Sequence, residues 1–335
     1  MKKILLAGLT VVLLLGAGIV QAKNYTITMH AGNVGGLYME PAVIWAEQIQ
    51  AAMPYVKMSC IAGGGSTNPI IVAKGKANET AGMTDPVTAM DVVKGEGEYA
   101  KRLPGGSKAL RALWRFNVQS WLHVVARPDA IPEGVTTLGE LLAKKPKLRI
   151  LLKSRGSGDE MLAARIFKEY GLSYDDLRKM GTSITFNNPS DMSSMLIDGH
   201  ADISISTARV PASYLLDMDS SISGLKWLEL DKNIIEKLRD QFGYIAGVQP
   251  KGSYSSVLRD IPSVANDHIV IVHEDMDEEL VYSLVKSVMS EPNKVHSIPA
   301  LKTFSANAAG LETGLPLHKG AIRAYKELGL PYSEN

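Results

Sequence analysis

The chain has little of what holds small secreted proteins together or binds transition metals. It has one cysteine, Cys60, in 335 residues, so no disulfide can form within the chain. Its seven histidines are scattered, without an H-E-x-x-H pair that would bind zinc. We therefore predict no metal site. The fold must rest on a hydrophobic core, for which 45% apolar residues are sufficient.

The chain also lacks an excess of charge of either sign. It carries 36 basic and 35 acidic residues, and without Lys2 and Lys3 the basic residues number 34. A nearly neutral surface argues against nucleic acid or an anionic membrane as the main partner. We therefore predict a small-molecule ligand and no nucleic-acid partner.

A long apolar run occurs only at the N-terminus. Lys2 and Lys3 precede an apolar stretch over residues 4–20, and Ala22 ends a small-residue segment, which is the layout of a secretory signal. We predict that residues 1–22 are a cleavable signal peptide and that the mature protein is periplasmic. The run of about 17 residues is at the short limit for spanning a bilayer, so an uncleaved anchor is the alternative.

Motifs for catalysis and nucleotide binding are absent. Gly32, Gly35 and Gly36 do not have the G-x-G-x-x-G spacing, and the turn GGGSTN (63–68) lacks the ending of a phosphate-binding loop. The serine in RGSGD (155–159) does not have the spacing of a G-x-S-x-G nucleophile elbow. These absences leave catalysis without support but do not exclude it. We predict no cofactor and no catalytic residue, and a receptor rather than an enzyme.

The sequence does contain a repeated unit of strand, polar turn and helix. Strand-like runs at 25–30, 56–62 and 79–84 each end in a polar turn, and a helical pattern follows each of them. This alternation predicts an α/β fold with largely parallel sheets, and a mature length of 313 residues favours two domains. A helix is expected at 160–170. Residues 207–267 are more mixed, with a second helix expected at 234–241 and the rest rich in loops. Further strands are expected at 148–152, 183–187, 201–206, 226–230 and 268–273.

The turns predict a binding site for an anion. A helix N-terminus leaves several N–H groups unsatisfied and carries about half a positive charge, so it binds carboxylate or phosphate without a cationic side chain. In an open α/β sheet, ligands lie beyond the carboxyl ends of the strands, where such turns meet. Gly35, Gly36, Ser66 and Asn68 are the first candidates, with close packing and ordinary helix capping as their alternative roles. Asp85 is expected to cap its helix or to contact an ammonium or hydroxyl group.

Six longer segments carry more information than single glycines: GGLYMEPAVIWAE (35–47), GGGSTNPIIVAKGKAN (63–78), RGSGDEMLAARIFKEYGLSYDDL (155–177), GSYSSVLRDIPSV (252–264), EELVYSLVKSVM (278–289) and GLPLHKGAIRAYKELGL (314–330). They extend over nearly the whole mature chain. Together they resemble the TAXI-type solute receptors of tripartite ATP-independent periplasmic (TRAP) transporters.

This resemblance implies a type II-like periplasmic-binding fold, with two α/β domains, a ligand cleft between them and crossing hinge strands. Domain I would comprise residues 23–122 and 268–335, and domain II residues 123–267. The crossings would lie near 121–127 and 264–272. The protein would act as a monomer, bind glutamate or a related carboxylate, and deliver it to membrane permease subunits that use an ion gradient.

The resemblance also assigns the turns that would hold the ligand. In this hypothesis Ser66, Asn68 and Ser157 donate hydrogen bonds, Tyr38 forms a packing wall, and Arg155 is a candidate partner for a carboxylate. The complete predicted set is Gly35, Gly36, Tyr38, Ser66, Thr67, Asn68, Asp85, Ser154, Arg155, Ser157, Gly158, Asp159, Thr207 and Arg209.

Two positions depart from the family pattern and leave the ligand class open. Leu37 stands where the family has the first residue of an aromatic pair, and Asp159 stands where it has threonine. A carboxylate at a helix start competes with a ligand anion, so Asp159 is expected to cap its own helix or to receive a ligand cation. An acidic amino acid, a keto acid and a dicarboxylate all remain candidates. The alternative functions are an enzyme acting through His123, Asp85 or Asp159, and a sensor for a membrane kinase.

Overall fold

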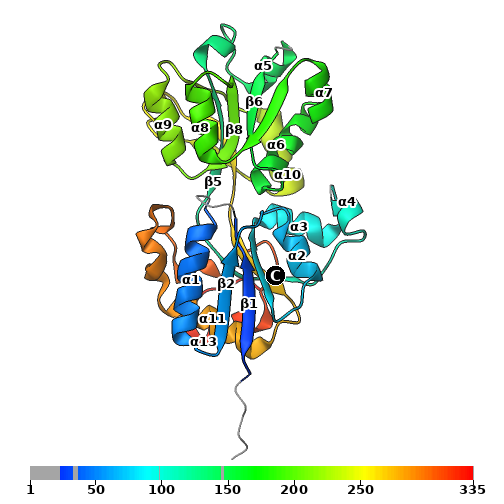
Figure 1. Ribbon diagram of the computed structural model, residues 1–335, viewed down its shortest axis with the longest axis vertical. Coiled ribbons are helices and arrows are strands. Elements are labelled where there is room, and N and C mark those ends of the chain that lie inside the picture. Colours follow the sequence, from blue (N-terminus) through cyan, green and yellow to red (C-terminus); the bar gives the residue numbers. More distant parts are fainter. Residues whose placement is uncertain (1–22, 33–36, 98, 145–146, 335) are drawn as a thin grey trace, which may run out of the picture.

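The computed structural model describes residues 23–32, 37–97, 99–144 and 147–334. This part of the chain forms two α/β lobes stacked along the long axis of the molecule (Figure 1). Lobe I contains the described residues of 23–115 and 269–334, and lobe II contains those of 120–266. The prediction of two α/β domains is confirmed. Among the helices that the structure describes, none has both the length and the apolar character needed to cross a bilayer.

The sheet of lobe I has five strands in the order β2-β1-β3-β12-β4. β1 runs parallel to β2 and β3, whereas β12 runs antiparallel to β3 and β4. The three parallel strands therefore end at the same edge of the sheet, where ligands bind in such folds. Their bounds are β1 Tyr25–His30, β2 Val56–Ile61, β3 Thr80–Thr84, β4 Leu110–Arg115 and β12 Ile269–His273.

The helices of lobe I are α1 Met39–Ala52, α2 Asn68–Lys74, α3 Pro86–Lys94, α4 Tyr99–Arg102, α11 Glu278–Ser290, α12 Ala306–Ala309 and α13 Lys319–Leu328. Figure 1 shows α1 and α11 on one side of the sheet and α2 and α3 on the other. Helix α1 buries Ala42, Trp45 and Ile49 at helical spacing. Trp45 packs edge to face against Trp114 and Phe116, and these rings form the centre of the core.

Lobe II contains a seven-stranded sheet in the order β10-β11-β5-β8-β6-β7, with β9 paired to β5. The strands are β5 Ser120–Ala126, β6 Arg149–Lys153, β7 Ser183–Asn187, β8 Ile203–Ala208, β9 Lys226–Trp227, β10 Ile245–Gln249 and β11 Ile261–Asn266. The helices are α5 Leu138–Ala143, α6 Gly158–Glu169, α7 Tyr174–Lys179, α8 Pro189–Ile197, α9 Ser213–Ser221 and α10 Lys232–Phe242. Helices α6 and α10 belong to one apolar cluster of the lobe, and α8 and α9 to another.

The chain crosses between the lobes at two short connections. Residues 116–119 join β4 to β5, and Asp267 and His268 join β11 to β12. Two such connections form a hinge about which lobes can rotate. The predicted first crossing, near 121–127, lies too late in the chain, because β5 pairs with β8 from Trp121 onward. The apolar run that forms β5 is evident in the sequence, but the sequence does not show which sheet this strand joins.

The region 207–267 is more regular than the sequence suggests. The helix expected at 234–241 is confirmed as α10, and the region also contains α9, β10 and β11 in addition to β9. The strand expected at 226–230 is wrong in length, because β9 ends at Trp227. Strands β10 and β11 pair with each other and extend the sheet beyond β5, so their stability comes from partners distant in sequence.

Candidate functional site

A cavity of about 110 Å³ lies between the two lobes, at the edge where the parallel strands end. Lobe I contributes the turns after β1, β2 and β3, and lobe II contributes the ends of β6, β7 and β8 together with the turns after β6 and β7. The start of β5, the end of β11 and the crossing after β11 complete the lining. The lining residues are Gly32, Leu37, Tyr38, Gly63, Gly64, Gly65, Asp85, Ser120, Lys153, Ser154, Arg155, Ser157, Gly158, Asp159, Asn187, Pro189, Thr207, Asn266 and His268.

The structure brings most of the predicted ligand-binding residues to this cavity. Those in its lining are Tyr38, Asp85, Ser154, Arg155, Ser157, Gly158, Asp159 and Thr207. Arg209 lines a neighbouring cavity between α8 and α9 instead. Ser66, Thr67 and Asn68 lie behind the lining, and Gly35 and Gly36 lie outside the described residues.

The turn before α2 is occupied by hydrogen bonds within the protein, so the expected anion contacts of Ser66 and Asn68 are wrong for this arrangement. The Ser66 hydroxyl donates to the Gly156 carbonyl of lobe II at 2.6 Å, and the N–H groups of Thr67 and Asn68 donate to Gly64. Asn68 is fully buried, and its amide donates to three backbone carbonyls. These groups hold the turn and join it to the other lobe.

The start of α6 is the helix N-terminus that faces the cavity. Ser157 caps it, since its hydroxyl accepts from the N–H of Glu160 at 3.1 Å. Within the described chain, no protein acceptor meets the N–H groups of Gly158 and Asp159. The Gly158 nitrogen lies 3.5 Å from the place a Cβ on Gly65 would take, so the start of α6 comes close to the turn after β2 in lobe I. Two donors and the positive end of α6 are thus available to an anion.

Asp159 does not cap its own helix, contrary to one of the two roles predicted for it. Its carboxylate accepts from the Thr207 N–H at 2.8 Å and pairs with the Lys153 ammonium at 2.9 Å. Burial opposes ionisation, but Lys153 and Thr207 together lower the pKa of Asp159. Because the carboxylate turns to β8, it leaves the N–H groups of α6 free.

Lys153 is the cationic side chain of the cavity, and the sequence analysis missed it. It is the last residue of β6, and its ammonium also donates to the Thr207 carbonyl at 2.6 Å. Burial opposes its charge, but the Asp159 carboxylate raises the pKa of Lys153. The signal was present in the sequence, because a lysine at the carboxyl end of a buried strand lies where ligands bind.

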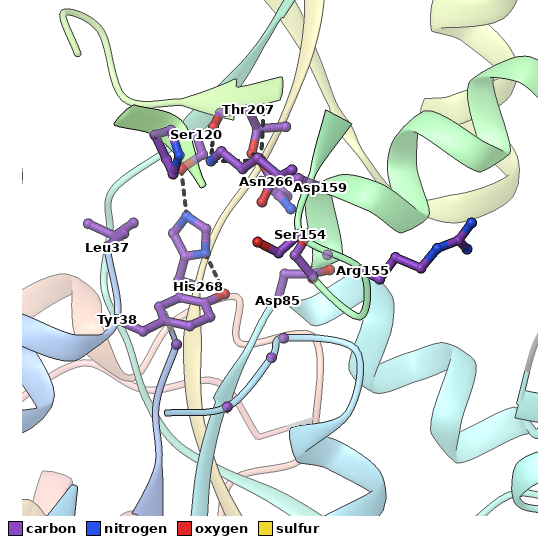
Figure 2. A pocket seen from close by; sticks show the side chains of 18 of the residues that line it. Leu37, Tyr38, Asp85, Ser120, Ser154, Arg155, Asp159, Thr207, Asn266 and His268 are labelled. Atoms are coloured by element: carbon purple, nitrogen blue, oxygen red, sulfur yellow. Dashed lines mark hydrogen bonds and ion pairs between the residues drawn. The ribbon is translucent and has the colours of Figure 1, made fainter. Parts of the chain in front are cut away.

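Arg155 lines the rim, but its charged end does not face the cavity. The guanidinium lies over the ring of Phe186, 4.0 Å from its centroid, and points away from the other lining residues (Figure 2). Its side chain is 58% exposed. Stacking of this kind stabilises a guanidinium without desolvating it. Lys153 therefore replaces Arg155 as the candidate partner for a ligand carboxylate.

Asp85 is the second carboxylate of the site and caps α3. It accepts from the N–H and the hydroxyl of Thr88 at 2.8 and 2.7 Å. Burial raises the pKa of Asp85 to about 6 despite these bonds. A Cβ on Gly158 would lie 2.7 Å from one of its carboxylate oxygens, so only glycine lets α6 approach this closely.

Tyr38, His268 and Ser120 form a hydrogen-bonded chain along one wall (Figure 2). The phenol oxygen lies 2.9 Å from Nδ1 of His268, and the Ser120 oxygen lies 2.8 Å from Nε2. Burial lowers the pKa of His268 to about 3, so the imidazole is neutral.

His123 is outside the lining, and its Nδ1 contacts Gln249 at 2.8 Å, which is the arrangement of a satisfied core histidine.

Two amide oxygens at the cavity lack a donor. The Oδ1 atoms of Asn187 and Asn266 are buried and have no hydrogen-bond partner among the residues that the structure describes. Asn266 is 4% exposed and stands at the end of β11, beside the crossing. An unpaired buried acceptor is costly, so both oxygens favour a ligand or water that donates to them.

Comparison with known proteins yields one family and several similar folds. A model described as the NMT1-like family matches residues 29–329. The chain is similar to PhnD1 from Prochlorococcus marinus in complex with methylphosphonate, at 10% identity and a TM-score of 0.55, over 92% of this chain and 98% of that one. It is also similar to MatC from Rhodopseudomonas palustris with bound malate, at 10% identity and a TM-score of 0.50, over 91% and 96%. The periplasmic binding protein BugD matches at 12% identity with a TM-score of 0.49, over 92% and 98%.

Proposed function

This chain belongs to the NMT1-like family and has the fold of periplasmic solute-binding receptors, and on that premise we propose that it captures a small carboxylate for a TRAP transporter of the TAXI type. In this proposal residues 1–22 direct export to the periplasm. The two lobes close on the ligand, and the closed form delivers it to membrane permease subunits.

The arrangement around α6 is the observation that carries the proposal. The free N–H groups of Gly158 and Asp159 and the ammonium of Lys153 all reach the same cavity. A carboxylate there would take hydrogen bonds from the helix start and would interact favourably with its positive end. Because Asp159 is engaged with Lys153 and Thr207, it leaves these N–H groups to the ligand.

Three further acceptor side chains of the cavity narrow the class of ligand. Asn187 and Asn266 offer unpaired oxygens, and Asp85 offers a carboxyl group. A ligand that carries a hydroxyl or amino group beside its carboxylate would satisfy them, and a wrong ligand would leave each unpaired at a cost of about 1–3 kcal/mol. Amino acids and hydroxy-dicarboxylates therefore fit better than simple fatty acids.

A thermal-shift screen followed by calorimetry tests the proposal. We would use L-glutamate, 2-oxoglutarate, malate and methylphosphonate as probes, with acetate as a control. A probe at 100 times its dissociation constant adds about 2.7 kcal/mol to stability, which raises the melting temperature by several degrees. The same samples followed by NMR should show every bound probe unchanged after hours. A flat screen would contradict the carboxylate class, and conversion of a probe would favour an enzyme.

A further inference from the structure

Three side chains from three separate segments meet at one wall of the cavity. Tyr38 immediately precedes α1, Ser120 begins β5, and His268 lies in the crossing between β11 and β12. Both imidazole nitrogens are engaged, at 2.9 Å from the phenol oxygen and 2.8 Å from the serine oxygen. All three residues line the cavity, and Figure 2 shows the imidazole between the two hydroxyl groups.

The number of protons in this chain exceeds the number of its hydrogen bonds by one. The neutral imidazole has one N–H, and each hydroxyl has one proton. Burial keeps the imidazole uncharged by lowering the pKa of His268 to about 3, and burial also raises the pKa of Tyr38, so the phenol keeps its proton. Two contacts use two of the three protons. One hydroxyl proton therefore remains for a group outside the chain.

The imidazole tautomer decides which hydroxyl holds that proton. If Nδ1 carries the hydrogen, it donates to Tyr38, Nε2 accepts from Ser120, and the phenol proton is free. If Nε2 carries it, the imidazole donates to Ser120 and accepts from Tyr38, and the serine proton is free. Among the described residues, neither hydroxyl has a second partner.

We propose that Tyr38, His268 and Ser120 form a switchable donor, in which a change of imidazole tautomer presents one hydroxyl proton to a ligand oxygen at either of two positions. The inference rests on the proposed function for its ligand, and it adds a cause of specificity. This wall can donate one hydrogen bond to a ligand oxygen near the Tyr38 phenol or to one near the Ser120 hydroxyl. It cannot donate to oxygens at both positions in the same complex. His268 acts here as a positioning residue, since it works through the two hydroxyl groups.

The tautomer can be measured without any ligand. Long-range proton–nitrogen NMR distinguishes the two neutral tautomers and the imidazolium, and a His268→Asn variant identifies the signal among the seven histidines. In Tyr38→Phe, Nδ1 has no partner, and in Ser120→Ala, Nε2 has none. A buried N–H without an acceptor is less tolerated than a bare acceptor. We therefore expect Nε2–H in Tyr38→Phe and Nδ1–H in Ser120→Ala. The same tautomer in both variants, or an imidazolium in the wild type at pH 7, would overturn the proposal.

Calorimetry with the probes named above supplies the second arm. For each probe that binds, one of the two variants should weaken binding about tenfold and the other by less than about threefold. Equal losses of affinity in Tyr38→Phe and Ser120→Ala for the same probe would contradict the proposal that only one hydroxyl proton is available to the ligand. If no probe binds, the proposed function fails, while the NMR arm still decides this inference.

Discussion

Arg165 of α6 and Asp91 of α3 join the two lobes through an ion pair of 2.5 Å outside the cavity. Each side chain is 12% exposed. The guanidinium also lies over Phe242, 4.1 Å from the ring centroid, and donates to the Tyr244 hydroxyl at 3.1 Å. The arginine is thus held by lobe II, and its carboxylate partner is supplied by lobe I when the lobes are in contact.

Loss of this pair should open the molecule. Removing one partner from a buried pair costs about 3–5 kcal/mol, and an exposed pair contributes about 0–1 kcal/mol. For this partly exposed pair we expect Asp91→Asn to disfavour closure by about 1–3 kcal/mol, which weakens apparent affinity roughly tenfold to a hundredfold. Calorimetry with a binding probe and small-angle scattering would measure this change.

The matched control is Glu274→Gln. Glu274 pairs with Arg111 at the same distance of 2.5 Å, but both residues belong to lobe I. Its loss should leave affinity and scattering radius unchanged. Equal effects of the two variants would show that Asp91 contributes to general stability rather than to closure.

Asp85 gives the stability of the protein an unusual dependence on pH. Its pKa is about 6 in the folded state and 3.8 for an unperturbed carboxyl. Between these values the folded state binds more protons than the unfolded state, so this group stabilises the fold at low pH and loses that contribution as pH rises through about 6. Asp85→Asn should keep the cap and remove the buried charge. We expect it to be more stable than wild type at pH 8, by up to about 3 kcal/mol, with no difference near pH 4.

Asp277 provides a control of opposite sign. It caps α11, and although burial opposes it, the hydrogen bond from the Leu280 N–H and the contact with Lys23 lower the pKa of Asp277. Its contribution is therefore present above the unfolded pKa and lost as pH falls. Asp277→Asn should be less stable than wild type at pH 8, with a smaller difference at pH 4. Urea unfolding at pH 4, 6 and 8 tests both, and parallel behaviour of the two variants would refute the assignment for Asp85.

The sequence located the candidate site because strand ends and helix starts are local features. Ser157, Gly158 and Asp159 lie at the edge of the cavity because β6 and α6 form where the local pattern predicts them. The partners of these residues are not local. Asp159 turns to Thr207, and Ser66 donates to Gly156, only because the fold brings distant segments together. No periodicity in the chain encodes these contacts.

Lys153 and Arg155 are a second case in which the local sequence does not predict the contacts of a side chain. The effects of their substitution on ligand affinity can be compared directly. Both are basic, and Lys153 ends β6 while Arg155 follows two residues later, yet Lys153 is buried against Asp159, whereas Arg155 stacks on Phe186 at the rim. We expect Lys153→Gln to weaken the binding of an anionic probe at least tenfold, because the buried charge is removed. Arg155→Gln should change affinity less than threefold, since a solvated charge is screened. Calorimetry at two salt concentrations measures both. If Arg155→Gln lost more affinity for the probe than Lys153→Gln, Arg155 would be the residue that contacts the ligand carboxylate.

A substitution at Gly64 would block the approach of the two lobes by steric overlap, without changing any charge. It lines the cavity in lobe I, and a Cβ there would overlap the Gly156 carbonyl of lobe II. Gly64 has a backbone conformation that alanine can adopt, so Gly64→Ala should fold with a melting temperature near that of wild type. The lobes should then stay apart, because a backbone carbonyl cannot move aside as a flexible side chain can.

Gly65→Ala is the matched control for this variant. A Cβ at Gly65 would meet its nearest neighbour, the Gly158 nitrogen, at 3.5 Å, which is ordinary contact. We expect a larger scattering radius in the presence of a probe and at least tenfold weaker affinity for Gly64→Ala, but a closed form for Gly65→Ala. If Gly64→Ala closes normally around the probe, the contact between Gly64 and Gly156 is not required for the bound state, and closure must depend on α3 and α6 instead.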